Sequence, residues 1–470
     1  MSQKLNDTIA AFERRFFYQL SQTLKKHHDP DGADLGSIAV AYSGGLDSTA
    51  LVHLVARFAQ EHKIMWFCVH VHHGLSPHAD QWLQHCQQTC NELKCDFESV
   101  RVLVQANGEG IEASARTARY RAIGEVCQRR GAKVVLTAHH IDDQAETVLM
   151  QLMRGSGVRG LAGMEFENKA PKLLGCESLT IARPLLGETR ELLENYCASL
   201  KLSNVEDESN RDVRFVRNAV RAKIIPEFED ISHGFAERVA RTACHMREAN
   251  LLLEELAAED LLTSSLDDGG LALSHIARFS LPRRRNLFRY WMARNGLQMP
   301  TTMKLDEIMR QLIEAKEDAR IQVHHNGVMF SRYQDRLYVV LNAPSVAGES
   351  ATLEVVSIVW AGEPSIELPG FSGKLYFKNA DIGVAHSKLL GQRLECRHRG
   401  TGERLRLGKN RPSRDMKSHF QSAGIPFWRR DQVPFIYLNA KLLFVGELGM
   451  EAEFLDESAG QKIQLEWRSN

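Results

Sequence analysis

The chain has 470 residues, of which 43% are hydrophobic and 25% are charged, and its 59 basic residues are balanced by 59 acidic ones. This length predicts roughly two to four domains, and the balanced charge excludes overall basicity as a sign of a nucleic-acid partner. Nine scattered cysteines without a C-x-x-C pair exclude a disulfide framework. Because no apolar run resembles a secretory signal or a membrane helix, we expect a reduced, cytoplasmic protein with no membrane partner.

The first segment, residues 5–24, has apolar side chains at helical spacing and is predicted to be an amphipathic helix. After it, short apolar strands alternate with helices. The strands are nearly continuous apolar runs, which is typical of strands that are covered on both faces. The pattern predicts a doubly wound parallel α/β domain over residues 1–226. Its strands are expected at 38–42, 65–71, 97–104 and 133–138, and its helices at 49–58, 79–93, 111–130 and from about Asp142.

Three cysteines, Cys86, Cys90 and Cys95, lie close together beside His85. One interpretation is a metal site, since cysteine and histidine are common ligands of soft metals. The other is a helix that turns small apolar residues toward the core. We favour the helix.

The segment 227–345 is predicted to be a mainly helical middle domain, and 346–470 a small α+β C-terminal domain. Helices are expected over 235–260, after Pro282 and after Pro300, followed by short strands at 320–324, 328–332 and 337–341. The small, polar segment 342–352 is predicted to be a linker.

The sequence SGGLDS stands where the first strand gives way to a helix, a position that offers free backbone N–H groups to an anion. Gly44 and Gly45 permit a tight turn, and Asp47 would repel a phosphate unless a cation such as Mg²⁺ lay between them. The predicted phosphate-binding loop comprises Ser43, Gly44, Gly45, Leu46, Asp47 and Ser48.

The sequence HHIDDQAET, residues 139–147, follows the fourth strand at the edge of the sheet where ligands bind in such folds. Asp143 and Glu146 are three residues apart on the new helix and therefore share a face. Beside His139 and His140, they suit metal binding, amine binding or proton transfer. An acidic first turn that only complements the helix dipole is the alternative.

SGGLDS resembles the PP-loop of the ATP pyrophosphatase superfamily, whose members activate an oxygen as an adenylate. Five further segments narrow the resemblance to the tRNA isoleucine lysidine synthetase family. They are HVHHGLS (70–76), IEASARTARYR (111–121), HHIDDQAET (139–147), RGSGVRGL (154–161) and the block 207–226. Segments 281–300 and 402–437 are similar to that family's middle and C-terminal domains.

This resemblance implies an ATP- and Mg²⁺-dependent ligase. It would join free L-lysine to carbon 2 of the first-anticodon-position cytidine of a CAU-anticodon isoleucine tRNA, changing codon reading from AUG to AUA. The residues expected to act in catalysis are Asp47, His139, Asp143, Glu146, Glu112 and Arg116, with Asp47 as the metal ligand. The residues expected to bind tRNA are Arg119, Arg154, Arg159, Arg217, Arg221, Arg284, Arg411, Arg414 and Lys417. Whether the protein is a homodimer is left open.

Residues 393–430 contain eleven basic residues against three acidic ones, with Phe420, Phe427 and Trp428 among them. Basic and aromatic side chains together suit an RNA backbone with stacked bases, and we expect contact with the acceptor arm of tRNA. A solvated charged face over core aromatics is the alternative. Arg283, Arg284, Arg285 and Arg289 form a second candidate contact.

Three other functions compete with the ligase. A tRNA thiolase would be expected to carry a cysteine pair or iron–sulfur ligands, and no C-x-x-C is present. NAD and GMP synthetases lack a basic C-terminal RNA-binding domain. A non-catalytic RNA-binding protein would be expected to have lost Asp47, Asp143 or Glu146, and all three are retained.

Overall fold

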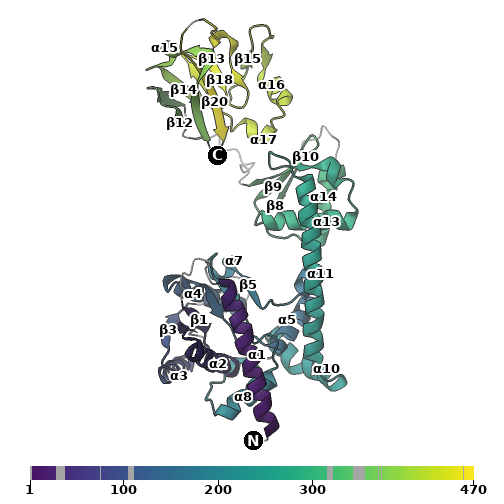
Figure 1. The fold of residues 1–470 in the computed structure, drawn as a ribbon. Helices are drawn as coiled ribbons and strands as arrows, with labels where there is room; N and C mark the ends of the chain where they lie inside the picture. The colour runs from purple at the N-terminus through teal and green to yellow at the C-terminus, as the bar shows by residue number, and fades with distance from the viewer. Residues whose placement is uncertain are drawn as a thin grey trace. The chain divides into compact units, whose positions relative to one another are not determined.

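The computed structural model describes residues 3–27, 37–74, 76–103, 111–314, 321–341, 355–368, 370–371, 373–458 and 460–469. The predicted linker at 342–352 lies outside them. The chain forms two compact units, Met1–Glu259 and Asp260–Asn470 (Figure 1). The finer division at residues 226 and 345 stays a prediction.

The first unit is built on a six-stranded sheet with the strand order β3-β2-β1-β4-β6-β5. Its strands are β1 (Ile38–Ala41), β2 (Trp66–His72), β3 (Asp96–Arg101), β4 (Val134–Leu136), β5 (Glu167–Lys169) and β6 (Thr180–Ala182). Every neighbouring pair is parallel except β5 and β6. The predicted parallel α/β domain is confirmed, while the parallel strand β6 and the antiparallel edge strand β5 were not predicted.

Helices cover both faces of this sheet (Figure 1). The helices before and between the strands are α1 (Gln3–His27), α2 (Leu46–His62), α3 (Ala79–Glu92), α4 (Ile111–Arg129), α5 (Ile141–Met153), α6 (Val158–Leu161), α7 (Pro171–Leu174) and α8 (Arg190–Leu200). Short helical turns follow at η1 (Glu208–Arg211), α9 (Val216–Ala219), η2 (Val220–Ile224) and α10 (Ile225–Ile231), and then comes the long helix α11 (Phe235–Ser264).

The alternation of side chains along each strand divides the core in two. Val40 and Leu136 point to one face, where they join apolar residues of α1, α2, α3 and α8. Ala39 and Val135 point to the other face, where they join residues of α4 and α7. Both faces are therefore apolar, which explains the nearly continuous apolar strands in the sequence.

The second unit begins with a four-stranded antiparallel sheet, in the order β7-β10-β9-β8, that packs against helices. Its elements are β7 (Leu271–Ala272), α12 (Leu273–Ile276), α13 (Leu281–Arg294), α14 (Thr302–Glu314), β8 (Ile321–His325), β9 (Val328–Tyr333) and β10 (Arg336–Leu341). The expected helices and three strands are present, and β7 was not predicted.

The C-terminal part contains a five-stranded sheet, β11-β14-β17-β18-β19, and a three-stranded sheet, β12-β13-β20. The strands are β11 (Val356–Val359), β12 (Ser365–Glu367), β13 (Gly373–Ala385), β14 (Arg393–Arg397), β15 (Arg404–Leu405), β16 (Arg414–Asp415), β17 (Phe435–Leu438), β18 (Lys441–Val445), β19 (Gly449–Met450) and β20 (Lys462–Ser469). The helices are α15 (His386–Leu389), α16 (Met416–Ser422), α17 (Phe427–Arg430) and η3 (Ala452–Phe454). The mixed content agrees with the α+β prediction.

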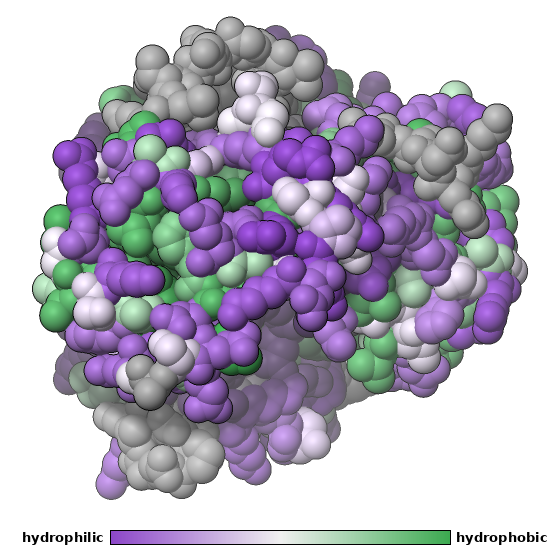
Figure 2. Space-filling model, turned by 90° about the horizontal axis from the view of Figure 1, so that it is seen from above, coloured by the Kyte–Doolittle hydropathy of each residue, from purple (hydrophilic) through white to green (hydrophobic). Residues whose placement is uncertain are grey.

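Among the described residues, no helix is both long and apolar enough to cross a membrane. The face seen from above is mostly hydrophilic with scattered hydrophobic side chains (Figure 2).

Candidate active site

The two motifs singled out in the sequence meet at one edge of the sheet. β1 and β4 are parallel neighbours, with Val40 opposite Leu136. The SGGLDS loop follows the carboxyl end of β1, and HHIDDQAET follows the carboxyl end of β4. Parallel strands end at the same edge, so the two segments lie side by side there.

The SGGLDS loop is closed by its own hydroxyl groups. The Ser43 and Ser48 hydroxyl oxygens are 3.0 Å apart, and the Ser48 hydroxyl donates to the Gly45 carbonyl at 2.9 Å. The Thr49 hydroxyl donates to the Gly44 carbonyl, which also accepts the backbone N–H of Val205 at 2.9 Å. Because α2 begins at Leu46, the free N–H groups of its first turn lie directly after this closed loop.

Gly44 has a φ of +88° and is in close contact with two other segments. A Cβ at this position would lie 2.9 Å from both Cys86 Sγ on α3 and Val205 Cγ2. Gly45 is different, since its φ is −69° and a Cβ there would meet no atom closer than 3.6 Å. Only Gly44 is required by the fold of the loop itself.

Gly44→Ala should therefore destabilise the ligand-free protein, whereas Gly45→Ala should not. We expect about 1–3 kcal/mol from the positive φ of Gly44, with an added cost from the steric contacts. Thermal unfolding of the two variants without ATP tests this. Adding Cys86→Ala to Gly44→Ala should recover part of the loss, and equal unfolding temperatures for the two glycine variants would contradict the assignment.

His140, at the start of α5, is fully buried among three carboxylates. Its Nδ1 lies 3.2 Å from Asp142 Oδ2, and its Nε2 lies 3.3 Å from Asp143 Oδ2 and 3.7 Å from Asp47 Oδ2. Burial alone would lower the pKa of His140, but attraction to Asp142, Asp47 and Asp143 outweighs it and raises the pKa to about 10. At neutral pH the site therefore contains an imidazolium beside Asp47.

His139 has the opposite character. Its Nδ1 is 2.9 Å from the Thr137 hydroxyl. Burial lowers the pKa of His139 to about 3, opposed by Asp143 and reinforced by the positive charges of Arg183, Arg116 and Arg217. His139 is thus uncharged at neutral pH. The positive charge of Arg116, which was also predicted to act in catalysis, contributes to the low pKa of His139.

Asp143 and Glu146 share one face of α5, as predicted, and both bind arginines from the segment 216–224. Arg217 donates from Nη2 to Asp143 at 2.8 Å and from Nε to Glu146 at 2.6 Å. Arg221, one turn later, pairs with the same two carboxylates. Glu146 is fully buried, and each of its two carboxylate oxygens contacts one guanidinium group: Oε2 contacts Arg217 and Oε1 contacts Arg221.

The ion pairs of Arg217 and Arg221 with Asp143 and Glu146 were not predicted from the sequence. Both arginines were expected among the tRNA-binding residues, and the structure places them at the acidic pair behind the SGGLDS loop. The π-helical turn η2 directly follows α9, so Arg217 and Arg221 lie four residues apart on continuous helical turns. Residues at this spacing lie side by side on one helix face. The two guanidinium groups thereby neutralise the charges of Asp143 and Glu146. Less negative charge is left to attract the ammonium group of a substrate.

The remaining predicted residues of the first unit lie at several places. Arg119 donates from Nε to Nε2 of His73, at 3.0 Å, and Arg116 lies over the Tyr120 ring. Arg154 and Arg159 are exposed at the end of α5 and in α6. Glu112 belongs to α4, but its side chain is outside the described part of the structure.

A divalent cation fits the carboxylate of Asp47. Its Oδ1 atom is buried and has no hydrogen-bond partner among the described residues, and Asp47 lies two residues after Gly45 in the SGGLDS loop. A carboxylate oxygen of this kind is a preferred ligand for Mg²⁺. His140 places a positive charge next to Asp47, in addition to that of a bound cation. The prediction of a metal ion from the sequence did not include this charge.

The basic surfaces of the second unit differ from expectation in part. The Arg284 guanidinium donates to the carbonyls of Phe279 and Ala277, while Arg283 and Arg285 pair with Asp260 and Asp306. Phe420 is fully buried in the core and cannot stack on a base, so the prediction for this aromatic residue was wrong. Arg411, Arg414 and Lys417 are exposed and form no ion pair with any described residue.

His140 was named beside the acidic pair but not among the catalytic residues, and Asp142 and Arg190 were not singled out as site residues. His140 and Asp142 belong to the HHIDDQAET motif, but the motif does not reveal which histidine turns toward Asp47. Arg190, at the start of α8, donates its backbone N–H to Asp142 at 2.9 Å, and the charges of Asp47 and Asp143 help raise its pKa against the effect of burial. No pattern in the sequence marked Arg190.

Three family profiles match consecutive parts of the chain: a PP-loop domain over residues 13–228, a TilS substrate binding domain over 271–338 and a TilS substrate C-terminal domain over 394–467. Among similar proteins is the tRNA(Ile)-lysidine synthase of Burkholderia pseudomallei, 38% identical over 92% of this chain and 93% of its own. Proteins of the same name from Alkalilimnicola ehrlichii and Serratia proteamaculans are 38% and 36% identical, over 92% of this chain and 94% and 95% of theirs.

Proposed function

The chain belongs to the tRNA(Ile)-lysidine synthase family, and we propose that it joins free L-lysine to a cytidine of isoleucine tRNA at the expense of ATP. The cytidine is the first anticodon nucleotide of the CAU-anticodon tRNA. The products are lysidine-containing tRNA, AMP and pyrophosphate. The modified tRNA would read AUA in place of AUG, and its identity would change from methionine to isoleucine.

The observation that carries this proposal is the convergence of the SGGLDS loop with a buried charged network at one sheet edge. The loop offers N–H donors and hydroxyls to an anion. The network offers Asp47, the imidazolium of His140, and two arginines held by two buried acids. Preorganised charges of both signs around an anion-binding loop suit the transfer of a nucleotidyl group.

In the first step, the oxygen on carbon 2 of the cytosine attacks the α-phosphorus of ATP, and pyrophosphate leaves. The N–H groups at the start of α2, with Ser43 and Ser48, bind the leaving phosphates. Asp47 would hold Mg²⁺, which supplies charge neutralisation for the phosphates. His140 holds Asp47 and Asp143 in place while it contributes positive charge close to the reacting phosphate.

In the second step, the ε-amine of lysine attacks carbon 2, AMP leaves, and the amine loses a proton. His139 is uncharged at neutral pH, so it can accept a hydrogen bond from the amine without repelling it. Arg217 and Arg221 are held rigidly by Glu146 and Asp143, and their positive charges favour the departing phosphate of AMP. Positioning of the two reactants supplies much of the remaining rate enhancement.

The exposed basic residues of the C-terminal part are proposed to bind the tRNA backbone. Arg411 lies between β15 and β16, Arg414 in β16 and Lys417 in α16. Beside them is a pocket of about 200 Å³ lined by Arg399, Arg404 and Lys417, among other residues. A cytoplasmic location accords with this partner, and the acceptor arm is the proposed contact.

Arg411→Ala combined with Arg414→Ala should weaken tRNA binding roughly tenfold and lower the slope of log affinity against log salt by about 2, because two phosphate contacts are lost. Filter binding over a salt series measures both quantities. Lys378→Ala with Arg468→Ala is a matched control, since it removes two charges that already pair with Glu466. An unchanged salt slope in the first variant would exclude this surface.

The reaction is tested by measuring AMP formation and the incorporation of labelled lysine. The substrates are unmodified isoleucine tRNA with a CAU anticodon and methionine tRNA with the same anticodon. We expect AMP and label only with isoleucine tRNA and lysine together. AMP formation without lysine incorporation would retain adenylation and exclude lysine as the nucleophile, and a sulfur donor would then be tried. Absence of both products would contradict the proposal.

A further inference from the structure

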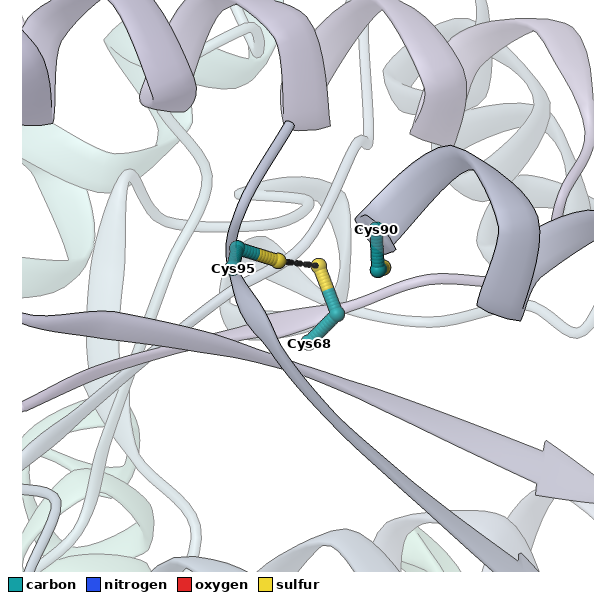
Figure 3. A group of neighbouring side chains, drawn as sticks. All are labelled: Cys68, Cys90 and Cys95. Carbon is teal, nitrogen blue, oxygen red and sulfur yellow. Dashed lines mark hydrogen bonds between the residues drawn. The ribbon is translucent and has the colours of Figure 1, made fainter. Parts of the chain in front are cut away.

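Three cysteines from β2, α3 and the turn between α3 and β3 lie close together. Cys68 lies in β2, Cys90 near the end of α3, and Cys95 in the turn before β3. Their Sγ atoms all lie within 4.8 Å of one another, and those of Cys68 and Cys95 are 3.7 Å apart. The three side chains point toward a common centre (Figure 3).

This trio differs from the one considered in the sequence. Cys86 and Cys90 are indeed buried on one face of α3, as the helical interpretation predicted. Cys86 contacts Gly44, however, while Cys95 lies beyond the helix end and Cys68 takes the third position from a neighbouring strand. Spacing along the chain could not reveal Cys68.

The arrangement matches the geometry of a metal bound by thiolates. Ligands at about 2.3 Å in a tetrahedral zinc site lie about 3.8 Å apart, close to the distance between Cys68 and Cys95. The turn is fixed by a backbone hydrogen bond of 3.0 Å from Cys95 N–H to the Cys90 carbonyl. The two ligands that flank the turn are therefore already held near each other.

Burial and charge also suit a cation. Cys68 and Cys90 are fully buried, whereas Cys95 is only half-buried and provides a route for an ion to enter. Once deprotonated, the three sulfur atoms carry negative charge, which favours a bound cation.

We propose that Cys68, Cys90 and Cys95 form a binding site for a thiophilic metal ion of the zinc class, with water as the fourth ligand. Soft sulfur ligands favour such ions over Mg²⁺. Binding converts the three thiols to thiolates and releases up to three protons, since only thiolates ligate the metal. Because Cys86 and Cys90 are one turn apart on α3, the ion would fix the helix that packs on the SGGLDS loop.

The test is a titration of the reduced, full-length protein with Cd²⁺, whose thiolate complexes absorb in the near ultraviolet, followed by competition with Zn²⁺. We expect one equivalent to bind, and X-ray absorption of the Zn²⁺-loaded protein to show three sulfur ligands at about 2.3 Å. Cys95→Ser changes the half-buried ligand and leaves the two core cysteines in place. It should weaken Zn²⁺ affinity at least about 100-fold.

Cys176→Ser is the matched control, since Cys176 is a half-buried thiol of the same unit beside Ser178. It should bind Cd²⁺ like the unaltered protein. Equal Cd²⁺ binding by the unaltered protein and Cys95→Ser would overturn the proposal. A second result would also overturn the proposal: the reduced protein binds no Cd²⁺, but mild oxidation removes two hydrogens from it. Two of the three cysteines would then form a disulfide, and the third would remain a free thiol.

Discussion

Asp47→Asn should lower ATP-dependent AMP formation by about 10²–10³-fold while leaving the fold intact. The substitution preserves shape but removes the negative charge that faces His140 at 3.7 Å and the buried Oδ1 proposed to hold Mg²⁺. Loss of one preorganised charge in an active site typically has an effect of this size. The measurement is AMP release with isoleucine tRNA and lysine over a Mg²⁺ series.

The Mg²⁺ series distinguishes two roles for Asp47. If Asp47 is a metal ligand, the variant should need more Mg²⁺ to reach half of its own maximal rate. If its main role is to hold His140, the rate should fall with no change in the Mg²⁺ requirement. Asp7→Asn, an exposed carboxylate of α1, serves as the control and should behave like the unaltered enzyme. A normal rate for Asp47→Asn would refute both roles.

Arg217→Met should destabilise the first unit by about 2–3 kcal/mol and abolish most of the activity. The change leaves Glu146, which is fully buried, with one guanidinium instead of two, and Asp143 loses its 2.8 Å contact. Removing one partner of a buried ion pair typically costs about 3–5 kcal/mol. We expect slightly less because Arg217 remains 25% exposed to solvent. Hydrogen exchange of peptides covering residues 141–153 reports this local stability.

Two further variants make the result specific. Arg214→Met removes a neighbouring arginine that pairs with Asp212 in a solvent-exposed ion pair, and it should leave the stability nearly unchanged. Glu146→Gln combined with Arg217→Met should cost less than the sum of the two single changes, since the stranded charge is gone. Additive effects would mean that Glu146 and Arg217 are not energetically coupled.

Sequence periodicity predicted the α/β architecture because it reports burial. Strands covered on both faces must be mostly apolar, and β1, β2 and β4 are, apart from His70 and His72 in β2. The antiparallel strand β5 was missed, since its three residues, Glu-Asn-Lys, carry no apolar signal. The short strand β7 was also missed, because two residues are too few to show an alternating pattern.

The SGGLDS loop was also predictable, because its chemistry is local. Gly44 needs a positive φ, Ser48 binds the Gly45 carbonyl three residues before it, and the helix begins at once. Each of these contacts joins residues within one turn of chain. A short motif therefore contains enough information to predict this loop at the end of β1.

The partners within the site were decided only by the tertiary structure. Arg217 meets Asp143 across 74 residues of sequence, and Cys68 meets Cys95 across 27. His139 and His140 are adjacent and identical in type, yet burial gives one a pKa of about 3 and the carboxylates around the other raise its pKa to about 10. Local sequence determines which turns and faces form, whereas the packing of distant segments determines the dielectric and the charges that each side chain meets.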